Sequence, residues 1–198
     1  MLAGAGVEAH EVAADDDVES FRLPQEDGGD AFIFYCNRPD GGAAAKVCLR
    51  ARGLEVLFEI GPCRGGAIVF DGAGRIVAWE GRGTLVVGGQ SLLSATDDIM
   101  VYSAGGLPLT ASESLVVLPF GQGSLRLHGT VARRGASHAV VGEVAAGAWR
   151  TLSAAAVTQE GAGAVVRWSA ADSRDIVLVG SPGGITAAAS SVVEDLHR

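Results

Sequence analysis

The sequence contains three tryptophans, and each of them stands beside a charged residue. The three pairs are Trp79-Glu80, Trp149-Arg150 and Arg167-Trp168. An exposed indole face can stack on a sugar ring while a neighbouring polar group orients the sugar. We therefore predict Trp79, Trp149 and Trp168 as candidate carbohydrate-binding residues. The alternative for each indole is a core position in which its N–H group is hydrogen-bonded.

Metal binding and cofactor binding have no comparable signal in the sequence. The histidines stand alone, at His10, His128, His138 and His197, without the paired spacings of metal sites. His128 and His138 would have to meet across a hairpin to share a metal ion. The sequence also lacks GxSxG, GxGxxG and GxxxxGK segments. We therefore expect no nucleophile elbow, no nucleotide cradle and no cofactor.

Two pairs of acidic residues have the residue types of a catalytic site but not the right spacing. Glu55 and Glu59 share one face of the segment 54–60. Four residues of strand span about 13 Å, which exceeds the ~5–9.5 Å between the carboxyl groups of glycosidases. We therefore expect the pair on the wet face of a half-buried strand. Asp97 and Asp98 precede the predicted strand 99–103 and resemble either a turn or a pair at the entry to that strand.

A catalytic site that assembles only in three dimensions remains a separate hypothesis. Its candidate residues flank predicted strands and have side chains that are used in catalysis. They are His128, His138, Asp97, Asp98 and Glu143.

The charge of the chain excludes one class of partner. Its 198 residues include 23 acidic and 15 basic side chains, which gives a formal net charge of −8. The segment 1–30 holds a disproportionate share of the acidic residues, with Arg22 as its single base, so the remainder is electrically balanced. Domains that bind nucleic acids electrostatically are usually basic, so we expect no nucleic-acid partner. The run of aspartates at 15–17 resembles a solvated tail more than a weak cation site.

Membrane insertion and disulfide bonding are not indicated either. No segment reaches the ~18 consecutive apolar residues of a membrane span, so we expect no membrane partner. The first twelve residues lack the basic region of a secretory signal, and the cellular location is left open. Cys36, Cys48 and Cys63 show no CxxC spacing. Three reduced thiols are the simpler expectation, and one disulfide with a free thiol is the alternative.

Short apolar runs separated by glycine-rich turns make up most of the chain after residue 30. Each run has the length and the content of β-branched residues that are typical of a strand. The runs cover 31–37, 46–50, 54–60, 66–70, 75–79, 84–87, 99–103, 114–118, 124–128, 138–144, 164–169 and 175–179. No helical stretch of about 10–15 residues separates them, which excludes a parallel fold of alternating strands and helices.

The sequence therefore predicts an all-β fold, an antiparallel β-sandwich of the jelly-roll type. We expect a flexible acidic leader over 1–30, part of which could form a marginal helix, and a sandwich body over 31–180. Apolar residues at helical spacing after Pro182 predict a short C-terminal helix within 181–198. The polar segment 132–137 is either a boundary that subdivides the body or a long loop.

Three stretches carry a resemblance to a known group of proteins. They are AFIFYCNRPDG (31–41), the segment 74–121 with its core DIMVYSAGGLPLTASESLVV, and GEVAAGAWRTL (142–152). Together they resemble the C-terminal accessory β-sandwich region of large bacterial glycoside hydrolases. In those enzymes the sandwich follows a catalytic (β/α) barrel, which this chain has no segment to form, so no catalytic carboxylate can be carried over. The resemblance implies a non-catalytic module associated with carbohydrate.

The first of three functional hypotheses is therefore a non-catalytic accessory module with a carbohydrate-binding or scaffolding role. The second is a structural domain that associates with itself as a homo-oligomer, because glycine- and valine-rich sandwiches with neutral bodies suit packing between copies. The third is the small enzyme described above. A sandwich fold alone does not decide among them.

Overall fold

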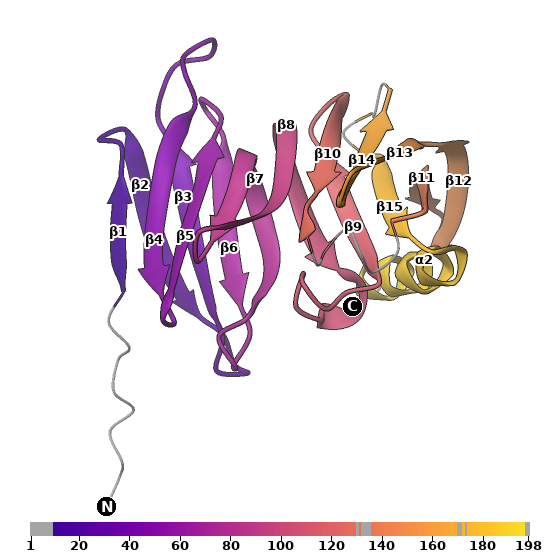
Figure 1. Ribbon diagram of the computed structural model, residues 1–198, viewed down its shortest axis with the longest axis horizontal. Coiled ribbons are helices and arrows are strands. Elements are labelled where there is room, and N and C mark those ends of the chain that lie inside the picture. Colours follow the sequence, from indigo (N-terminus) through magenta and orange to yellow (C-terminus); the bar gives the residue numbers. More distant parts are fainter. Residues whose placement is uncertain (1–9, 130, 132–135, 170–171, 173, 197–198) are drawn as a thin grey trace, which may run out of the picture.

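The computed structural model describes residues 10–129, 131, 136–169, 172 and 174–196. These residues form fifteen β-strands, a short 3-10 turn η1 (Ala104–Gly106) and one helix, α2 (Pro182–Leu196), shown in Figure 1. The strands are β1 (Glu11–Ala14), β2 (Val18–Pro24), β3 (Asp30–Cys36), β4 (Ala45–Ala51), β5 (Leu54–Ile60), β6 (Gly65–Phe70), β7 (Ile76–Val87), β8 (Gln90–Ser103), β9 (Ser114–Pro119), β10 (Gly123–Leu127), β11 (His138–Ala145), β12 (Ala148–Ala154), β13 (Ala156–Glu160), β14 (Gly163–Trp168) and β15 (Ile176–Gly180).

All pairings between these strands are antiparallel, and they arrange the strands in two layers. In layer A the order is β1-β4-β5-β7-β8-β10-β14-β13. In layer B the order is β2-β3-β6-β7-β8-β9-β15-β11-β12. Strands β7 and β8 belong to both layers, so the hydrogen bonding is continuous. The predicted all-β, sandwich-like fold is confirmed, and the sheet does not close into a barrel.

The alternation of side chains along each strand explains why the two layers stack. In β3, Phe32, Phe34 and Cys36 are buried, whereas Ile33 and Tyr35 point to the other face and are exposed. Period-two alternation of this kind gives a strand one apolar face for the core. Across the layers, Phe34 of β3 contacts Phe58 of β5 edge-on, with ring centroids 5.4 Å apart. The buried side chains of both layers form one continuous core.

Strands β7 and β8 are longer than the sequence indicated. The runs 75–79 and 84–87 were predicted as two strands, but they are the two ends of β7. The first end pairs with β6 in layer B and the second with β5 in layer A. Gly83 has a φ of +66°, and the register shifts between Gly81 and Gly83. The glycines therefore bend the strand between layers instead of ending it.

The N-terminal segment is the main correction to the predicted organisation. Residues 1–9 lie outside the described part of the chain, but the expectation of a flexible leader fails for residues 11–24. These residues form β1, which pairs with β4, and β2, which pairs with β3. Acidic residues did not prevent strand formation, because Asp15 and Asp17 in the intervening turn pair with Arg38 at 2.7 and 3.0 Å.

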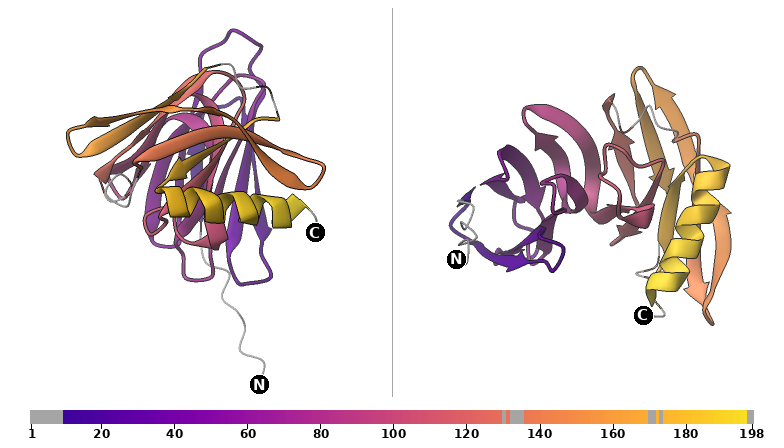
Figure 2. Two further views of the ribbon diagram at one scale, coloured as in Figure 1. Left: turned by 90° about the vertical axis from the view of Figure 1, so that its right-hand side faces the viewer. Right: turned by 90° about the horizontal axis from the view of Figure 1, so that it is seen from below.

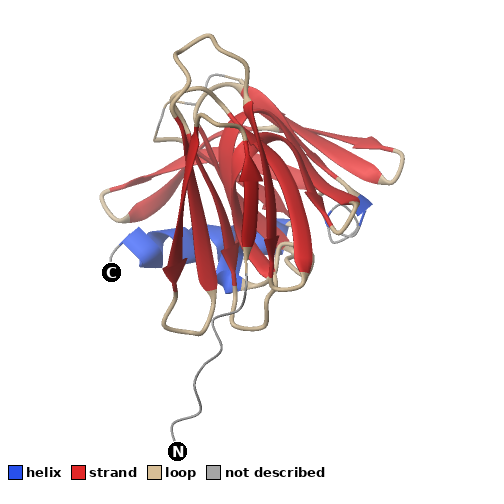
Figure 3. Ribbon diagram, turned by 90° about the vertical axis from the view of Figure 1, so that its left-hand side faces the viewer, coloured by secondary structure: helices blue, strands red, loops and turns tan. Residues whose placement is uncertain are grey.

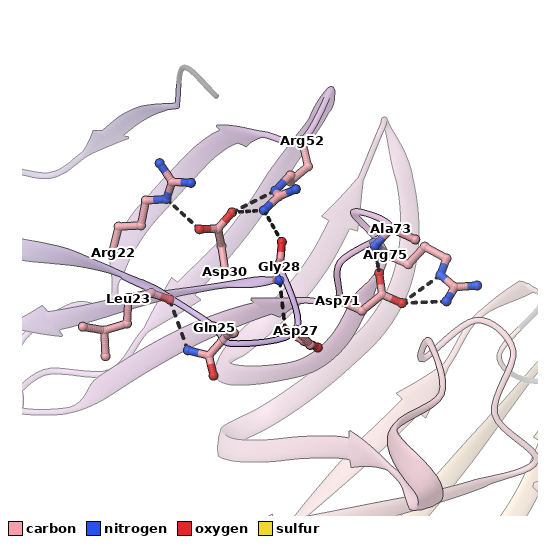
Figure 4. A network of polar contacts seen from close by, with 11 residues as sticks. Arg22, Leu23, Gln25, Asp27, Gly28, Asp30, Arg52, Asp71, Ala73 and Arg75 are labelled. Carbon is pink, nitrogen blue, oxygen red and sulfur yellow. Dashed lines mark hydrogen bonds and ion pairs between the residues drawn. The ribbon is translucent and has the colours of Figure 1, made fainter. Parts of the chain in front are cut away.

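A buried carboxylate ties the start of β3 to the rest of this end of the molecule. Asp30 is 1% exposed and accepts hydrogen bonds from Nε of Arg22 at 2.7 Å and Nε of Arg52 at 2.8 Å (Figure 4). Arg52 also donates to the carbonyl of Gly28 at 2.8 Å. The turn between β2 and β3 is therefore held against the turn between β4 and β5.

Helix α2 covers only one half of the outer face of layer B. Its buried residues Ala188, Ala189 and Val192 pack against Val116 of β9 and Leu178 of β15. The helix begins after Ser181, whose hydroxyl accepts a hydrogen bond from the amide of Gly184 at 3.2 Å, as a capping residue does. The predicted C-terminal helix is confirmed. Figures 1 and 2 show the helix beside the C-terminal strands, away from β1 to β6.

The segment 132–137 was predicted as a boundary or a long loop, and residues 132–135 of it lie outside the described part of the chain. Strands on both sides of this segment contribute to the same core. Strands β12 and β13, which follow the segment and were not predicted, are exposed along most of their length.

Candidate functional site

Two of the three candidate tryptophans are core residues in this structure. Trp79 is fully buried in β7, and Trp168 is 6% exposed at the end of β14 and donates from its indole Nε1 to the carbonyl of Gly121 at 2.8 Å. Neither ring has an open face, so neither can stack on a sugar. A charged neighbour in the sequence does not indicate that an indole is exposed. Successive residues of a strand point to opposite faces, so Glu80 beside Trp79 marks the face that the indole does not occupy.

Trp149 differs from the other two, because it is half-buried on the edge strand β12. Its indole packs on the helix-covered side of layer B and donates a hydrogen bond from Nε1 to the hydroxyl of Thr151 at 3.1 Å. On the neighbouring strand β11, Gly142 leaves room for the ring, since a Cβ at Gly142 would lie 2.2 Å from the indole. Among the predicted tryptophans, Trp149 alone keeps part of its surface open.

The five residues proposed for a three-dimensional catalytic site lie in different parts of the fold. His128 follows β10 in layer A and hydrogen-bonds to Ser94 at 2.8 Å. His138 and Glu143 belong to β11 in layer B, where His138 contacts Ser137 and Glu143 pairs with Arg150 at 3.8 Å. The structure therefore does not bring the two histidines to one side of a shared hairpin.

Asp97 and Asp98 do not form a turn before a strand, because both lie inside the long strand β8. Asp98 is 3% exposed, accepts a hydrogen bond from the amide of Gly61 at 2.8 Å, and lies 3.6 Å from Arg82. Burial raises the pKa of the nearby Glu80 carboxyl, and the charge of Asp98 raises it further. Glu55 and Glu59 lie on the outer side of β5, as predicted. The contacts of Asp98 join strands, which is a structural role.

The other features that could carry chemistry are acidic groups, thiols and a surface depression. Within the described ranges, no group of three or more histidine, cysteine, aspartate or glutamate side chains is placed to hold a metal ion. The three cysteines are free thiols, with Cys36 buried, Cys48 half-buried and Cys63 exposed. No helix in the described part of the chain is long and apolar enough to cross a membrane.

A shallow depression of about 410 Å³ on the outside of layer A includes Cys48 and Leu57.

The most distinctive surface lies on the outer side of layer B, where α2 does not reach. Register positions run straight across this layer from Leu23 through Ala31, Val69 and Ala78 to Tyr102. Beyond Tyr102 the row passes beneath the helix. On the uncovered part, four large side chains of neighbouring strands are exposed, and we call them the β2–β3 face. They are Phe21 (55%), Leu23 (49%), Ile33 (38%) and Tyr35 (43%).

The β2–β3 face ends at an open strand edge. Among the described strands, β2 pairs only with β3. The amide of Asn37 donates to the carbonyl of Asp17, and the amide of Gln25 donates to that of Gly29. Antiparallel pairs alternate between bonded and non-bonded positions, so the backbone groups of Ser20 point away from β3. Figure 3 looks onto this end of the molecule, where strands and loops face the viewer and the helix lies behind.

The sequence pattern indicates only one half of this face. The alternation of 31–37 placed Ile33 and Tyr35 on the face opposite Phe32 and Phe34. Phe21 and Leu23 lie within 1–30, where the many acidic residues favour a flexible leader over a strand. Their spacing of two residues was the available signal, since it puts both on one face of a strand.

Known proteins give no further guide to this surface. Comparisons with models of protein families, with curated proteins and with solved structures find no match to this chain. The fold and the β2–β3 face are therefore the observations on which its function is inferred.

Proposed function

We propose that this chain is a non-catalytic β-sandwich module that acts as a scaffold by associating with a second copy of itself through the β2–β3 face. The observation that carries the proposal is the cluster of four exposed large side chains on the uncovered half of layer B. The other half of the same layer face is covered by α2. An apolar sheet face of this kind is stabilised when a second surface removes it from water.

The size of the face supports a specific interaction. With roughly 200 Å² for each large side chain, the four exposed fractions correspond to about 370 Å² of surface. The largest apolar patch on a typical monomer is about 300–600 Å², and such patches are often functional. A standard interface buries about 800 Å² on each partner, of which about 60% is apolar. The β2–β3 face therefore supplies most of the apolar part of one side of a dimer interface.

A second copy suits this face because a twofold interface uses the same patch on both subunits. Two β2–β3 faces would bring phenylalanine, leucine, isoleucine and tyrosine side chains together, with Glu19, which lies opposite Tyr35 in the register and accepts a hydrogen bond from Asn37, at one end of the cluster. The open edge at Ser20 adds backbone hydrogen-bonding groups at the rim of the same surface, where edge strands commonly pair with another chain.

The experiment is sedimentation of the purified chain over a range of concentrations. We expect a monomer–dimer equilibrium in the wild type and at least a tenfold weaker association in Phe21→Thr/Leu23→Thr. Threonine keeps a high preference for strands, so we expect circular dichroism and thermal unfolding of the monomer to stay close to those of the wild type.

The matched control is Leu57→Thr, because Leu57 is also exposed, at 37%, but lies on β5 in layer A. We expect this variant to associate like the wild type. A wild-type chain that stays monomeric at the highest attainable concentration would contradict the proposal, and so would equal weakening by Leu57→Thr.

A second candidate function is carbohydrate binding at Trp149, which follows from the glycoside hydrolase resemblance and is supported by the half-buried ring of Trp149 on an edge strand. The test is a titration of the protein with a glycan panel while tryptophan fluorescence is recorded. Saturable quenching that is lost in Trp149→Ala supports this role, whereas a flat response removes it. Trp79 and Trp168 are not included in the proposal, because their rings are buried.

A further inference from the structure

A cavity of about 450 Å³ lies between the C-terminal end of α2 and the outer face of layer B. Its lining combines an apolar floor with an acidic rim. Val77 and Ala78 of β7 form the floor, and Tyr102 of β8 lines the cavity beside η1. From the helix, Ser191, Glu194 and Asp195 complete the lining.

The acidic residues occupy an unfavourable position for the stability of the helix. The C-terminal end of a helix carries a partial negative charge, so basic residues are preferred there. In α2 the last turn holds no basic residue and instead holds Glu194 and Asp195. Neither carboxylate forms an ion pair with a residue in the described part of the chain, which ends at Leu196, before His197 and Arg198. The helix end and both carboxylates therefore add their negative potential at the rim of one cavity.

The Tyr102 hydroxyl lies within the electrostatic influence of Asp195, one of these two acidic residues. Burial raises the pKa of the Tyr102 hydroxyl, and the charge of Asp195 raises it further. The side chain therefore stays a neutral phenol that can donate or accept a hydrogen bond. Two independent elements, β8 and α2, thus present polar groups to the cavity while β7 presents small apolar side chains.

We propose that this cavity binds an organic cation, a primary ammonium or guanidinium group on a short apolar stem. The cationic group lies beside Glu194 and Asp195, and the stem lies on Val77 and Ala78. A metal ion fits less well, because the lining offers two exposed carboxylates and an apolar floor in place of a closed set of oxygen ligands. A cationic group on a short apolar stem occurs both in a free alkylamine and in a lysine or arginine side chain of a polypeptide.

This site is separate from the surface used in the proposed function, although the two adjoin. Ala78 in the cavity floor lies opposite Val69 of β6, and Val69 lies opposite Ala31 of β3. Binding of a cation needs no second copy of the chain, so dimerisation and cation binding can fail independently.

The experiment is an NMR titration of the full chain with n-butylammonium chloride at low ionic strength. The amide signals of Gly105 and Gly106 are the reporters, because both residues line the cavity. We expect saturable shifts with a dissociation constant on the order of 1 mM. Each further methylene that enters the cavity is expected to tighten binding about fourfold, and added salt is expected to weaken it.

Two comparisons make the result decisive. In Glu194→Gln/Asp195→Asn we expect binding to weaken at least tenfold. The matched control, Glu26→Gln/Asp40→Asn, removes the same charge from exposed positions elsewhere and is expected to bind like the wild type. Shifts of equal size with n-butanol, equal loss in both variants, or no saturation would each overturn the proposal.

A further titration distinguishes a free amine from a lysine side chain as the source of the cation. Nα-acetyl-lysine-N-methylamide carries the same butylammonium stem on a peptide unit. Tighter binding of this compound than of n-butylammonium supports a lysine side chain of a polypeptide as the occupant. Equal or weaker binding supports a free amine, and both results retain the cation site.

Discussion

The carboxylate of Asp30 is buried between two arginines, and it accepts a hydrogen bond from Arg52 at 2.8 Å across 22 positions of the chain. Arg22 donates to the other oxygen at 2.7 Å. This contact joins the β2–β3 turn to the β4–β5 turn, so it positions the strands that carry the β2–β3 face.

We expect Asp30→Ala to lower the free energy of unfolding by about 3 kcal/mol, because it removes the partner of two partly buried charges. Urea denaturation at neutral pH measures this change. Asp40→Asn is the control, since Asp40 is exposed, and we expect a change within about 0.5 kcal/mol. A loss of less than about 1 kcal/mol in Asp30→Ala would show that the arginines find other partners.

The same contact gives the stability a pH dependence of known sign. Burial alone would raise the pKa of Asp30, but hydrogen bonds from Arg22 and Arg52 lower it below its ordinary value. The stabilisation is therefore present above the unfolded-state pKa of about 3.9 and is lost as the pH falls through the lower folded-state value. Unfolding curves recorded between pH 7 and pH 2.5 are expected to show a smaller acid-induced loss in Asp30→Ala than in the wild type.

The contribution of Glu80 to the free energy of unfolding is expected to have the opposite pH dependence. Its pKa is raised by burial and by the charge of Asp98, so its ionised form disfavours the folded state. We expect Glu80→Gln to raise the free energy of unfolding at pH 7, and this gain to disappear below about pH 4.3, where the unfolded state is also protonated. Urea midpoints at pH 7 and pH 4 measure the difference. Equal gains at both values would count against this cause.

The position of Trp149 depends on the absence of a side chain at Gly142. A Cβ there would lie 2.2 Å from the indole and 2.7 Å from the carbonyl oxygen of Arg150. We expect Gly142→Ala to displace the ring, to shift tryptophan emission to the red and to destabilise the fold by about 1–3 kcal/mol. Ala148→Gly, on the same hairpin, serves as the control for emission. Unchanged emission in Gly142→Ala would show that the strand moves instead of the indole.

The sequence predicted most of the body of the sandwich because its signal is local. In β3 and β5, alternation of apolar and polar side chains was sufficient to identify both the strand and its buried face. The bend in β7 was not predictable in the same way, because a glycine can end a strand or bend it. Its outcome depends on pairing with both β5 and β6, which are distant in sequence.

The candidate site was harder to predict than the fold. Burial of Trp79 and exposure of Phe21 depend on which strands cover each face, and residue types alone do not encode this. The position of α2 decides it for layer B, since the helix covers Val116 and leaves Leu23 open. A predicted helix over 181–198 did not indicate which strands it would contact.

Because β7 and β8 belong to both layers, they determine which parts of the molecule unfold together. Neither layer can open along its middle without breaking hydrogen bonds in the other, so the centre behaves as one cooperative unit. The outermost strands, β12 and β13 above all, are held on one side only and have few buried side chains. Local opening therefore begins at the periphery, and hydrogen exchange should be slowest along the paired central parts of β7 and β8, where both strands pass from one layer to the other.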